Sequence, residues 1–313
     1  MSIAAEELFR DGPRILDGGL ATELEARGGD LSGGLWSAKF LLDAPEKIVG
    51  AHEAFFSAGA EVAKSAGYQA SFEGFAEHGV GPEQATELMR RSVELAGEAA
   101  HLAPVREQVA KTAAHRTGRL VAASVGPYGA MLADGSEYRG RYGIGHRALV
   151  DFHRPRLEAF AAAAPDLFAL ETVPDVDEAV ALLDALDGLG VSAWLSFTIS
   201  GDRTRAGQPL EEAFAVAADR DDVLAVGVNC CSPADATRAV PIARAVSGKP
   251  VVVYPNSGES WDAERQVWTG RSGFDAALVT RWVTDGAGLV GGCCRVAPAD
   301  IAELTAHLHR PDQ

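Results

Sequence analysis

The chain has little positive charge and no long apolar run, and these absences exclude several classes of protein. Its 313 residues include 28 lysines and arginines against 44 aspartates and glutamates, a formal net charge of −16. Such a chain repels nucleic acid and anionic membranes, so we expect neither as a partner. No run of about 18 apolar residues occurs, and no basic segment followed by an apolar one opens the chain. We therefore expect no membrane span and no secretory signal, and a cytoplasmic location.

Familiar phosphate-binding and histidine metal motifs are also missing. The first predicted strand leads into Asp17-Gly18-Gly19-Leu20-Ala21-Thr22, which is not the dinucleotide fingerprint G-x-G-x-x-G, and no G-x-x-x-x-G-K-[ST] occurs. The eight histidines form no H-x-x-x-H pair, so we expect no histidine metal site. Cysteine is scarce, and its four residues stand as two adjacent pairs, Cys230-Cys231 and Cys293-Cys294. In a cytosolic chain, clustered cysteines indicate metal binding or catalysis more than disulfides.

What the sequence does contain is an alternation of short apolar runs and longer amphipathic segments. In Val176–Leu189, for example, Val176, Val180 and Leu183 follow the spacing of one helix face. The other helical candidates include Pro45–Ala58, Pro82–Ala103, Ala234–Val246 and Asp275–Thr284. The apolar runs predict parallel strands buried on both faces: Arg14–Asp17, Glu61–Lys64, Leu120–Ser124, Leu167–Glu171, Ala193–Phe197, Leu224–Asn229, Val251–Tyr254 and Gly288–Val290.

Eight strands alternating with helices predict an α/β fold, a single (β/α)8 TIM-type barrel, for which about 250 residues is typical. We expect the additional length in long βα loops, chiefly Gly18–Leu41, Val125–His146 and Pro255–Gly273. The alternative, an open doubly wound sheet, would normally present a glycine-rich phosphate loop after its first strand. A barrel places its chemistry at the carboxyl ends of its strands. The polar residues expected to gather there are Asp17, Glu171, Asn229 with Cys230, Tyr254 with Asn256, and Cys293 with Cys294.

The two cysteine pairs follow the predicted sixth and eighth strands, whose ends a closed barrel brings together. Zinc takes thiolate ligands in tetrahedral geometry. Adjacent cysteines on a regular strand point to opposite faces. Both can therefore reach one metal only if the backbone bends away from the strand, and Gly291-Gly292 permits such a bend. From spacing alone, a metal site, inert buried cysteines and a redox pair all stay open.

The number of cysteine ligands would decide what such a metal does. Four thiolates close a structural site, whereas three leave a position open for substrate. A barrel with its own large core has little need of a structural metal, which favours three.

A series of stretches along nearly the whole chain matches the motifs of a known family in the family's order. They are Ile15–Gly19, Ala21–Gly28, Leu35–Lys39, Tyr68–Ala70, Ser124–Ala130, Asp134–Gly140, Phe152–Arg156, Gly227–Cys230, Val252–Glu259 and Gly291–Arg295. In these stretches the chain resembles the zinc-dependent homocysteine S-methyltransferases, and most closely those that use S-methylmethionine or S-adenosylmethionine.

The resemblance implies a fold, a metal and a set of site residues. It implies that residues 1–313 form a single homocysteine-binding barrel domain and that Cys230, Cys293 and Cys294 hold one Zn²⁺. It also implies that Asp17, Gly18 and Glu171 hold the amino and carboxylate groups of homocysteine. Cys231 falls outside the family's pattern and has no expected role.

Further substrate contacts are expected from polar and aromatic side chains at strand ends and on the long loops: Tyr68, Asn229, Tyr254 and Trp36. Asn229 is placed to donate to a metal-bound sulfur or to satisfy backbone groups, and the two tyrosines could bind polar groups of the substrate.

The aromatic residues of the long loops are candidates for a cationic donor. Trp36, Tyr128 and Tyr138 could face a sulfonium through cation–π contact, with packing of the loops as the alternative. Asp134 and Glu137 lie in the same stretch as Tyr138 and could hold the donor's charged groups.

The expected reaction follows from thiol chemistry, because the thiolate is the nucleophile and a metal-bound thiol is deprotonated. A methyl group would pass from a sulfonium donor, S-methylmethionine or S-adenosylmethionine, to the homocysteine thiolate, giving methionine. One alternative is a selenocysteine or other thiol methyltransferase, and another is a barrel with a closed, all-cysteine structural zinc and different chemistry. The expected partners are small molecules, homocysteine and a sulfonium methyl donor. We expect the chain to be a monomer.

Overall fold

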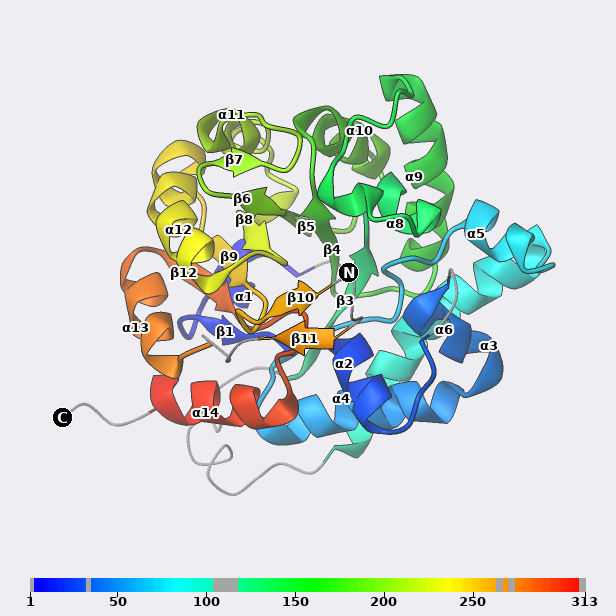
Figure 1. Cartoon of the computed structure of the whole chain (residues 1–313), viewed down its shortest axis with the longest axis horizontal. Helices are drawn as coiled ribbons and strands as arrows, with labels where there is room; N and C mark the ends of the chain where they lie inside the picture. The colour runs from blue at the N-terminus through cyan, green and yellow to red at the C-terminus, as the bar shows by residue number, and fades with distance from the viewer. Residues whose placement is uncertain (1–2, 32–34, 104–117, 263–266, 270–273, 310–313) are drawn as a thin grey trace.

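Eight strands form one sheet at the centre of the molecule, in the order β1-β12-β9-β8-β5-β4-β3-β2, and all of its hydrogen-bonded pairs are parallel (Figure 1). An isolated parallel bridge between Leu16 and Val62 joins the first strand to the second, so the sheet closes on itself. The computed structural model describes residues 3–31, 35–103, 118–262, 267–269 and 274–309. The strands are β1 (Arg14–Ile15), β2 (Val62–Lys64), β3 (Leu120–Val125), β4 (Leu167–Val173), β5 (Ala193–Phe197), β8 (Val223–Asn229), β9 (Val251–Tyr254) and β12 (Ala287–Val290). The predicted barrel is confirmed.

A helix follows each strand, and Figure 1 shows these helices as a ring around the sheet. They are α4 (Pro45–Ala58), α6 (Pro82–Leu102), α9 (His146–Ala161), α10 (Val176–Leu186), α11 (Leu210–Ala215), α12 (Pro233–Ser247), α13 (Ala276–Thr284) and α14 (Pro298–Leu308). Helix α4 begins with Pro45 in its first turn and ends at Ala58, and the next residue, Gly59, has a φ of 110° that suits glycine. Helix α10 ends at Leu186, earlier than predicted, because Asp187 already has extended backbone with ψ of 128°.

The core has an inner and an outer part. The outer part fills the space between strands and helices. The inner part fills the barrel, where Trp194 and Tyr254 are fully buried. Helix α1 (Ala5–Leu8) sends Leu8 into this inner cluster, and Arg14 donates to the Leu8 carbonyl over 2.9 Å. Since Arg14 begins β1, α1 covers the amino-terminal end of the barrel and leaves the carboxyl-terminal end for chemistry.

The long loops carry short elements of their own. The three predicted loops contain α2 (Leu20–Ala26), η1 (Trp36–Lys39) and α3 (Phe40–Asp43), then α8 (Tyr128–Leu132) and η2 (Ser136–Tyr138), and finally β10 (Ser260–Asp262) and β11 (Val267–Thr269). Helix α5 (Phe72–Glu77) and the hairpin of β6 (Ile199–Ser200) and β7 (Arg203–Thr204) were not predicted. Within the described part of the chain, no helix is long and apolar enough to cross a membrane.

Candidate metal centre and active site

Three cysteine side chains meet at the carboxyl-terminal end of the barrel. The Sγ atoms of Cys230, Cys293 and Cys294 all lie within 4.8 Å of one another. Those of Cys230 and Cys294 are 3.8 Å apart. Two thiolates bound at about 2.3 Å to a tetrahedral zinc stand about 3.8 Å apart, so the cluster fits such an ion. Hydrogen bonds from Cys293 and Cys294 lower the pKa of the Cys230 thiol well below its ordinary value, so the cluster favours a thiolate.

The backbone of β8 carries Cys230 into this cluster by a close approach and a sharp turn. A Cβ at Gly227 would stand 1.9 Å from the Val252 carbonyl oxygen, so only glycine lets β8 lie this close to β9. Just beyond the strand, Cys230 has a φ of 50°, a left-handed conformation that is costly for a residue with a Cβ. Thr198 donates to the Cys230 carbonyl over 3.1 Å and holds this turn in place.

The other two cysteines are held by hydrogen bonds to the segment after β9. The Cys293 N–H donates to the Pro255 carbonyl over 2.8 Å, and the Cys294 N–H donates to Oδ1 of Asn256 over 3.1 Å. The preceding glycines serve packing here, since neither has a positive φ. A Cβ at Gly292 would stand 2.2 Å from Cγ1 of Val296, which excludes any larger residue.

Cys231 does not join the cluster. Its side chain is 1% exposed and belongs to the outer core between strands and helices. Burial raises the pKa of its thiol, which keeps the group neutral. The fourth cysteine of the chain is therefore a small apolar core residue, and the cluster holds three sulfurs.

A buried ion pair lies beside the cluster, between Asp17 after β1 and Lys64 at the end of β2. The Lys64 ammonium donates to Oδ1 of Asp17, and the Lys64 N–H donates to Oδ2 over 2.9 Å. Asp17 is fully buried and Lys64 is 7% exposed. Lys64 was not among the predicted site residues, although a charged residue closing an apolar strand was a signal for it. A Cβ at the adjacent Gly18 would stand 2.2 Å from the Val296 carbonyl oxygen, so this position also requires glycine.

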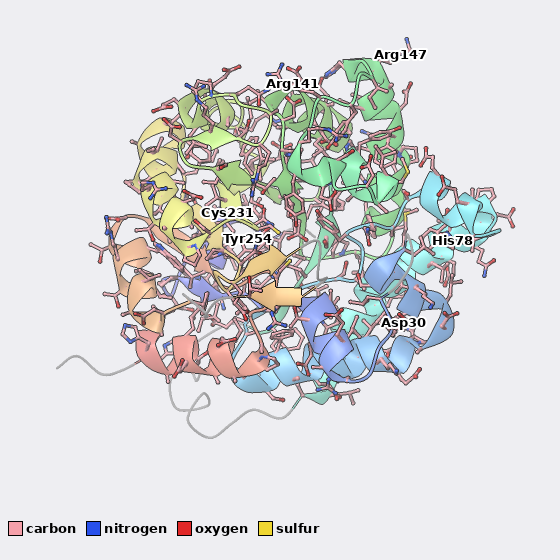
Figure 2. All side chains as sticks on the ribbon, viewed as in Figure 1. Asp30, His78, Arg141, Arg147, Cys231 and Tyr254 are labelled. Atoms are coloured by element: carbon pink, nitrogen blue, oxygen red, sulfur yellow. The ribbon has the colours of Figure 1, made fainter. Side chains whose placement is uncertain are left out.

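The Glu171 carboxylate, in β4, is held from both sides. The Tyr254 hydroxyl donates to Oε2 over 3.0 Å, and the Ser124 hydroxyl donates to Oε1. Burial raises the pKa of Glu171 to about 7, against the opposing effect of Lys64. The Tyr254 hydroxyl also accepts from Trp194 Nε1 over 3.1 Å, so Tyr254 orients Glu171 from the barrel interior, at the centre of Figure 2.

Asn229 serves the backbone in this structure. Its Oδ1 accepts from the Thr172 N–H and its Nδ2 donates to Oγ1 of Thr172, both over 2.7 Å. Thr172 has a φ of 60°, so the amide holds a left-handed residue directly after Glu171. Asn229 thereby links the end of β8 to the end of β4.

Tyrosines and an acidic residue cover the cluster. The Tyr138 hydroxyl lies 3.1 Å from Sγ of Cys230, and the Arg205 guanidinium lies 5.7 Å from the centre of its ring. Tyr68 is near enough to Cys230 and Glu137 for both, after burial, to raise the pKa of its phenol. Glu137 is 5% exposed, and its Oε2 has no hydrogen-bond partner among the described residues. The side chain of Trp36 lies outside the described part of the chain.

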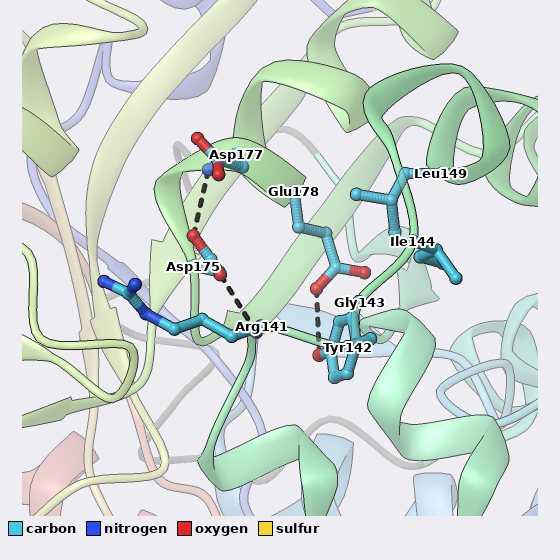
Figure 3. Close-up of a pocket in the computed structure, with 8 residues that line it drawn as sticks. All are labelled: Arg141, Tyr142, Gly143, Ile144, Leu149, Asp175, Asp177 and Glu178. Atoms are coloured by element: carbon cyan, nitrogen blue, oxygen red, sulfur yellow. Dashed lines mark hydrogen bonds between the residues drawn. The ribbon is translucent and has the colours of Figure 1, made fainter.

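A crevice of about 280 Å³ beside this cover shows how the loop after β3 is anchored (Figure 3). The Arg141 N–H donates to Oδ2 of Asp175 over 3.0 Å, and the Tyr142 hydroxyl donates to Oε2 of Glu178 over 3.1 Å. His153, 2.9 Å from Oε1 of Glu178, is fully buried. These contacts fix the loop to α10 and hold Tyr138 over the cysteines.

The ring of Tyr128, in contrast, packs against the loop and helix α9. It lies 5.2 Å from the ring of Tyr142 and 4.9 Å from the ring of Phe152, measured between centroids. Its hydrogen-bonded backbone reinforces this position, since the Tyr128 N–H donates to Glu178 over 2.5 Å. The Tyr128 ring therefore makes packing contacts, and its contact with a donor stays a prediction.

A closed (β/α)8 barrel with three cysteine sulfurs grouped at the carboxyl ends of its strands has the architecture of an enzyme whose site is able to hold a metal ion through thiolates. The family model for homocysteine S-methyltransferase matches residues 14–308. The chain therefore belongs to the homocysteine S-methyltransferase family.

Individual relatives agree in sequence and in fold. Homocysteine S-methyltransferase 4 from Zea mays is 45% identical, over 94% of this chain and 88% of the relative. Selenocysteine Se-methyltransferase from Brassica oleracea var. italica is 41% identical, over 97% and 91%. The crystal structure of the metallated form of the homocysteine methyltransferase MmuM from Escherichia coli superimposes with a TM-score of 0.82, at 42% identity, over 95% of this chain and 96% of that one.

Proposed function

We propose that this chain transfers a methyl group from a sulfonium donor to the thiol of homocysteine, giving methionine, with one zinc ion held by Cys230, Cys293 and Cys294. The observation that carries this proposal is the group of three sulfurs within 4.8 Å of one another, with the fourth cysteine buried elsewhere. Three protein thiolates leave one tetrahedral position for a substrate sulfur. The family membership of the chain supports the acceptor and the product.

In the proposed reaction, the metal activates the acceptor thiol and the protein positions the two substrates. When bound, zinc supplies the deprotonation of the acceptor thiol near neutral pH. The methyl carbon then leaves the donor sulfur as a new carbon–sulfur bond forms, and the bonding pair returns to the donor sulfur, giving a neutral thioether. No general acid is needed, so the protein contributes positioning and electrostatics.

The residues around the cluster suit these tasks. Glu171, oriented by Ser124 and Tyr254, is placed to accept the acceptor's ammonium. The Tyr138 ring and the unpartnered Glu137 oxygen offer a cationic donor an aromatic face and a carboxylate. Three cysteines kept free as metal ligands need a reducing compartment, which supports a cytoplasmic location.

Donor profiling tests this proposal. The zinc-loaded protein is incubated with homocysteine and with S-methylmethionine, S-adenosylmethionine or betaine in turn, and methionine is measured. A sulfonium donor is expected to give product and betaine to give none. The mechanism is contradicted if betaine is the one donor that gives methionine. It is also contradicted if a Cys293→Ser variant forms methionine at the full rate.

A second acceptor is favoured by one comparison, the Brassica selenocysteine Se-methyltransferase at 41% identity. A selenol carries the same amino acid groups and is more acidic than a thiol. Competition between equal concentrations of homocysteine and selenocysteine for a limiting donor separates the two functions, because the ratio of products then equals the ratio of kcat/KM values.

A further inference from the structure

The ring of Tyr138 lines the way from solvent to the three sulfurs. The Tyr138 hydroxyl lies 3.1 Å from Sγ of Cys230, whereas 37% of the residue is exposed. The side chain therefore has one end at the cluster and another part at the surface. A molecule that brings a reacting atom to the cluster along this side of the site passes the Tyr138 ring.

The guanidinium of Arg205 stands over this ring, 5.7 Å from its centre. Arg205 directly follows β7, and it is exposed. Its N–H donates to the Thr198 carbonyl over 3.3 Å, and the Thr198 hydroxyl donates to the Cys230 carbonyl. The segment that carries Arg205 is thus tied to the turn that carries Cys230, which fixes the guanidinium beside the entrance to the cluster.

The Arg205 guanidinium is free for a ligand. Among the residues that the structure describes, it forms no ion pair and no hydrogen bond, and its partner is the Tyr138 ring. The other arginines of the loop after β3 and of the hairpin donate to hydroxyl or carbonyl oxygens of the protein: Arg139, Arg141 and Arg203.

An arginine in this state suits one kind of ligand. The chain has 44 acidic residues against 28 basic ones, so an arginine without a carboxylate partner at the site entrance is unusual for its composition. Contact with an aromatic face leaves the N–H edge of a guanidinium open. That planar edge matches the two oxygens of a carboxylate.

Sulfonium donors that are amino acids carry such a carboxylate. In S-methylmethionine and S-adenosylmethionine, a short chain links the sulfonium to the carbon that bears the carboxylate. When the methyl group faces the cluster, this chain extends away from the sulfurs along the Tyr138 ring and brings the carboxylate to the guanidinium. A sulfonium without a carboxylate meets only the repulsion of the Arg205 charge.

We propose that Arg205 binds the α-carboxylate of the methyl donor and thereby makes the site selective for sulfonium donors that are amino acids. This inference rests on the proposed function. Arg205 determines which donor binds, both by attracting the carboxylate and by repelling cations that lack one. The chemical step stays with the groups around the cluster.

Two donors that differ only in the carboxylate test the inference. The zinc-loaded protein methylates homocysteine with S-methylmethionine or with (3-aminopropyl)dimethylsulfonium, and kcat and KM are measured for each donor. The wild type is expected to have a kcat/KM about fivefold or more higher for S-methylmethionine, the size of a charge-assisted hydrogen bond at a partly exposed site. In Arg205→Gln this ratio is expected to fall to about twofold or less, through a higher KM for S-methylmethionine at a nearly unchanged kcat.

Two further variants sharpen the test. Arg205→Glu reverses the charge and is expected to lower the ratio below that of Arg205→Gln, because the new carboxylate repels that of the donor and attracts the analogue. Arg203→Gln is the matched control, since Arg203 is an exposed arginine of the same hairpin that donates to the Gly207 carbonyl over 3.0 Å. It is expected to keep the wild-type ratio.

The contrary results are distinct. A ratio that stays at the wild-type value in Arg205→Gln, or an equal loss for both donors, overturns the inference. If the analogue reacts too slowly to measure, the KM for S-methylmethionine decides, and an unchanged KM in Arg205→Gln overturns the inference. If the wild type uses both donors equally well, the inference fails alone. If the wild type uses neither donor, the proposed function fails with it.

Discussion

The hydroxyl of Tyr138 lies 3.1 Å from Sγ of Cys230, although 92 residues separate the two along the chain. The contact joins the loop after β3 to the end of β8. It gives a sulfur of the cluster a hydrogen-bond partner outside the cluster. Partners of this kind tune a metal site through the charge on its ligand.

Removing that hydroxyl is expected to weaken the metal site without emptying it. Tyr138→Phe deletes the hydrogen bond to the Cys230 sulfur and keeps the ring, so zinc affinity is expected to fall by about tenfold. Competition with a chromogenic chelator measures it. Tyr128→Phe is the matched control, since the Tyr128 ring packs against Tyr142 and Phe152. Equal affinity in wild type and Tyr138→Phe would show that the contact does not act on the metal.

Substitutions of the adjacent cysteines Cys230 and Cys231 are expected to have different effects on zinc binding. Cys230→Ser removes one sulfur of the cluster and is expected to abolish stoichiometric zinc binding, measured by elemental analysis after gel filtration. Cys231→Ala changes only a core residue, so zinc content is expected to stay at the wild-type level and stability to fall by about 1 kcal/mol. Loss of zinc in Cys231→Ala would mean that the site is closed by four cysteines.

A single methyl group at Gly227 is expected to disturb the site through packing. The added Cβ of Gly227→Ala would meet the Val252 carbonyl oxygen at 1.9 Å, so β8 and β9 must move apart, at a cost of about 1–3 kcal/mol in the free energy of unfolding.

Gly97→Ala is the control for this measurement. Gly97 lies inside α6, and a Cβ there meets nothing within 4 Å, so the substitution is expected to stabilise the protein by about 0.5–1 kcal/mol. Denaturant unfolding compares the two. A Gly227→Ala protein as stable as the wild type would contradict the close approach.

The affinity for an acceptor with an ammonium group is expected to depend on Glu171. Its pKa is raised to about 7, so the carboxyl is neutral below that pH and anionic above it. The attraction for an ammonium is therefore gained as pH rises through about 7 and lost as pH falls.

The measurement compares the affinity for homocysteine with the affinity for 4-mercaptobutanoate, which lacks the ammonium. The ratio of the two affinities is followed from pH 6 to pH 8, about one pH unit on either side of that pKa. Thiol ionisation affects both ligands and cancels in the ratio. The ratio is expected to rise with pH in the wild type and to stay flat in Glu171→Gln. A rise of equal size in Glu171→Gln would assign the titration to another group.

The same pKa shift affects folding with the opposite sign. Because the folded-state pKa of Glu171 lies above its ordinary value of about 4.5, the folded protein holds this proton more tightly than the unfolded chain does. This group's contribution to stability is therefore present below about pH 4.5 and is lost as pH rises to about 7. Urea unfolding across that pH range measures the free energies of unfolding of Glu171→Gln and of the wild type. As pH rises, the wild type is expected to lose stability relative to the variant. A difference that stays constant would contradict the shifted pKa.

The sequence predicted the fold well because its signals are local. Apolar runs such as Val251–Tyr254 have the length of a buried strand, and proline and glycine mark both ends of Pro45–Ala58. It also predicted that the cysteines after β8 and β12 would meet, since the order of strands in a closed barrel places their ends together.

Features that depend on long-range contacts could not be predicted in this way. A lysine that closes an apolar strand signals a polar site at that end, but only the folded chain shows that its partner is Asp17. Asn229 gives no sign in the sequence that it will hold Thr172. The position of Tyr138 depends on anchors at Asp175 and Glu178, which lie in another loop and helix.

The position of β12 between β1 and β9 has a consequence for how the protein is made. Two of the three sulfurs follow this last strand, so a chain still emerging from the ribosome offers a metal ion only Cys230. A copy that ends before Cys293 therefore lacks two of the three sulfurs of the cluster. A metal ion could therefore be held by all three sulfurs only after β12 has been made and has paired with β1 and β9.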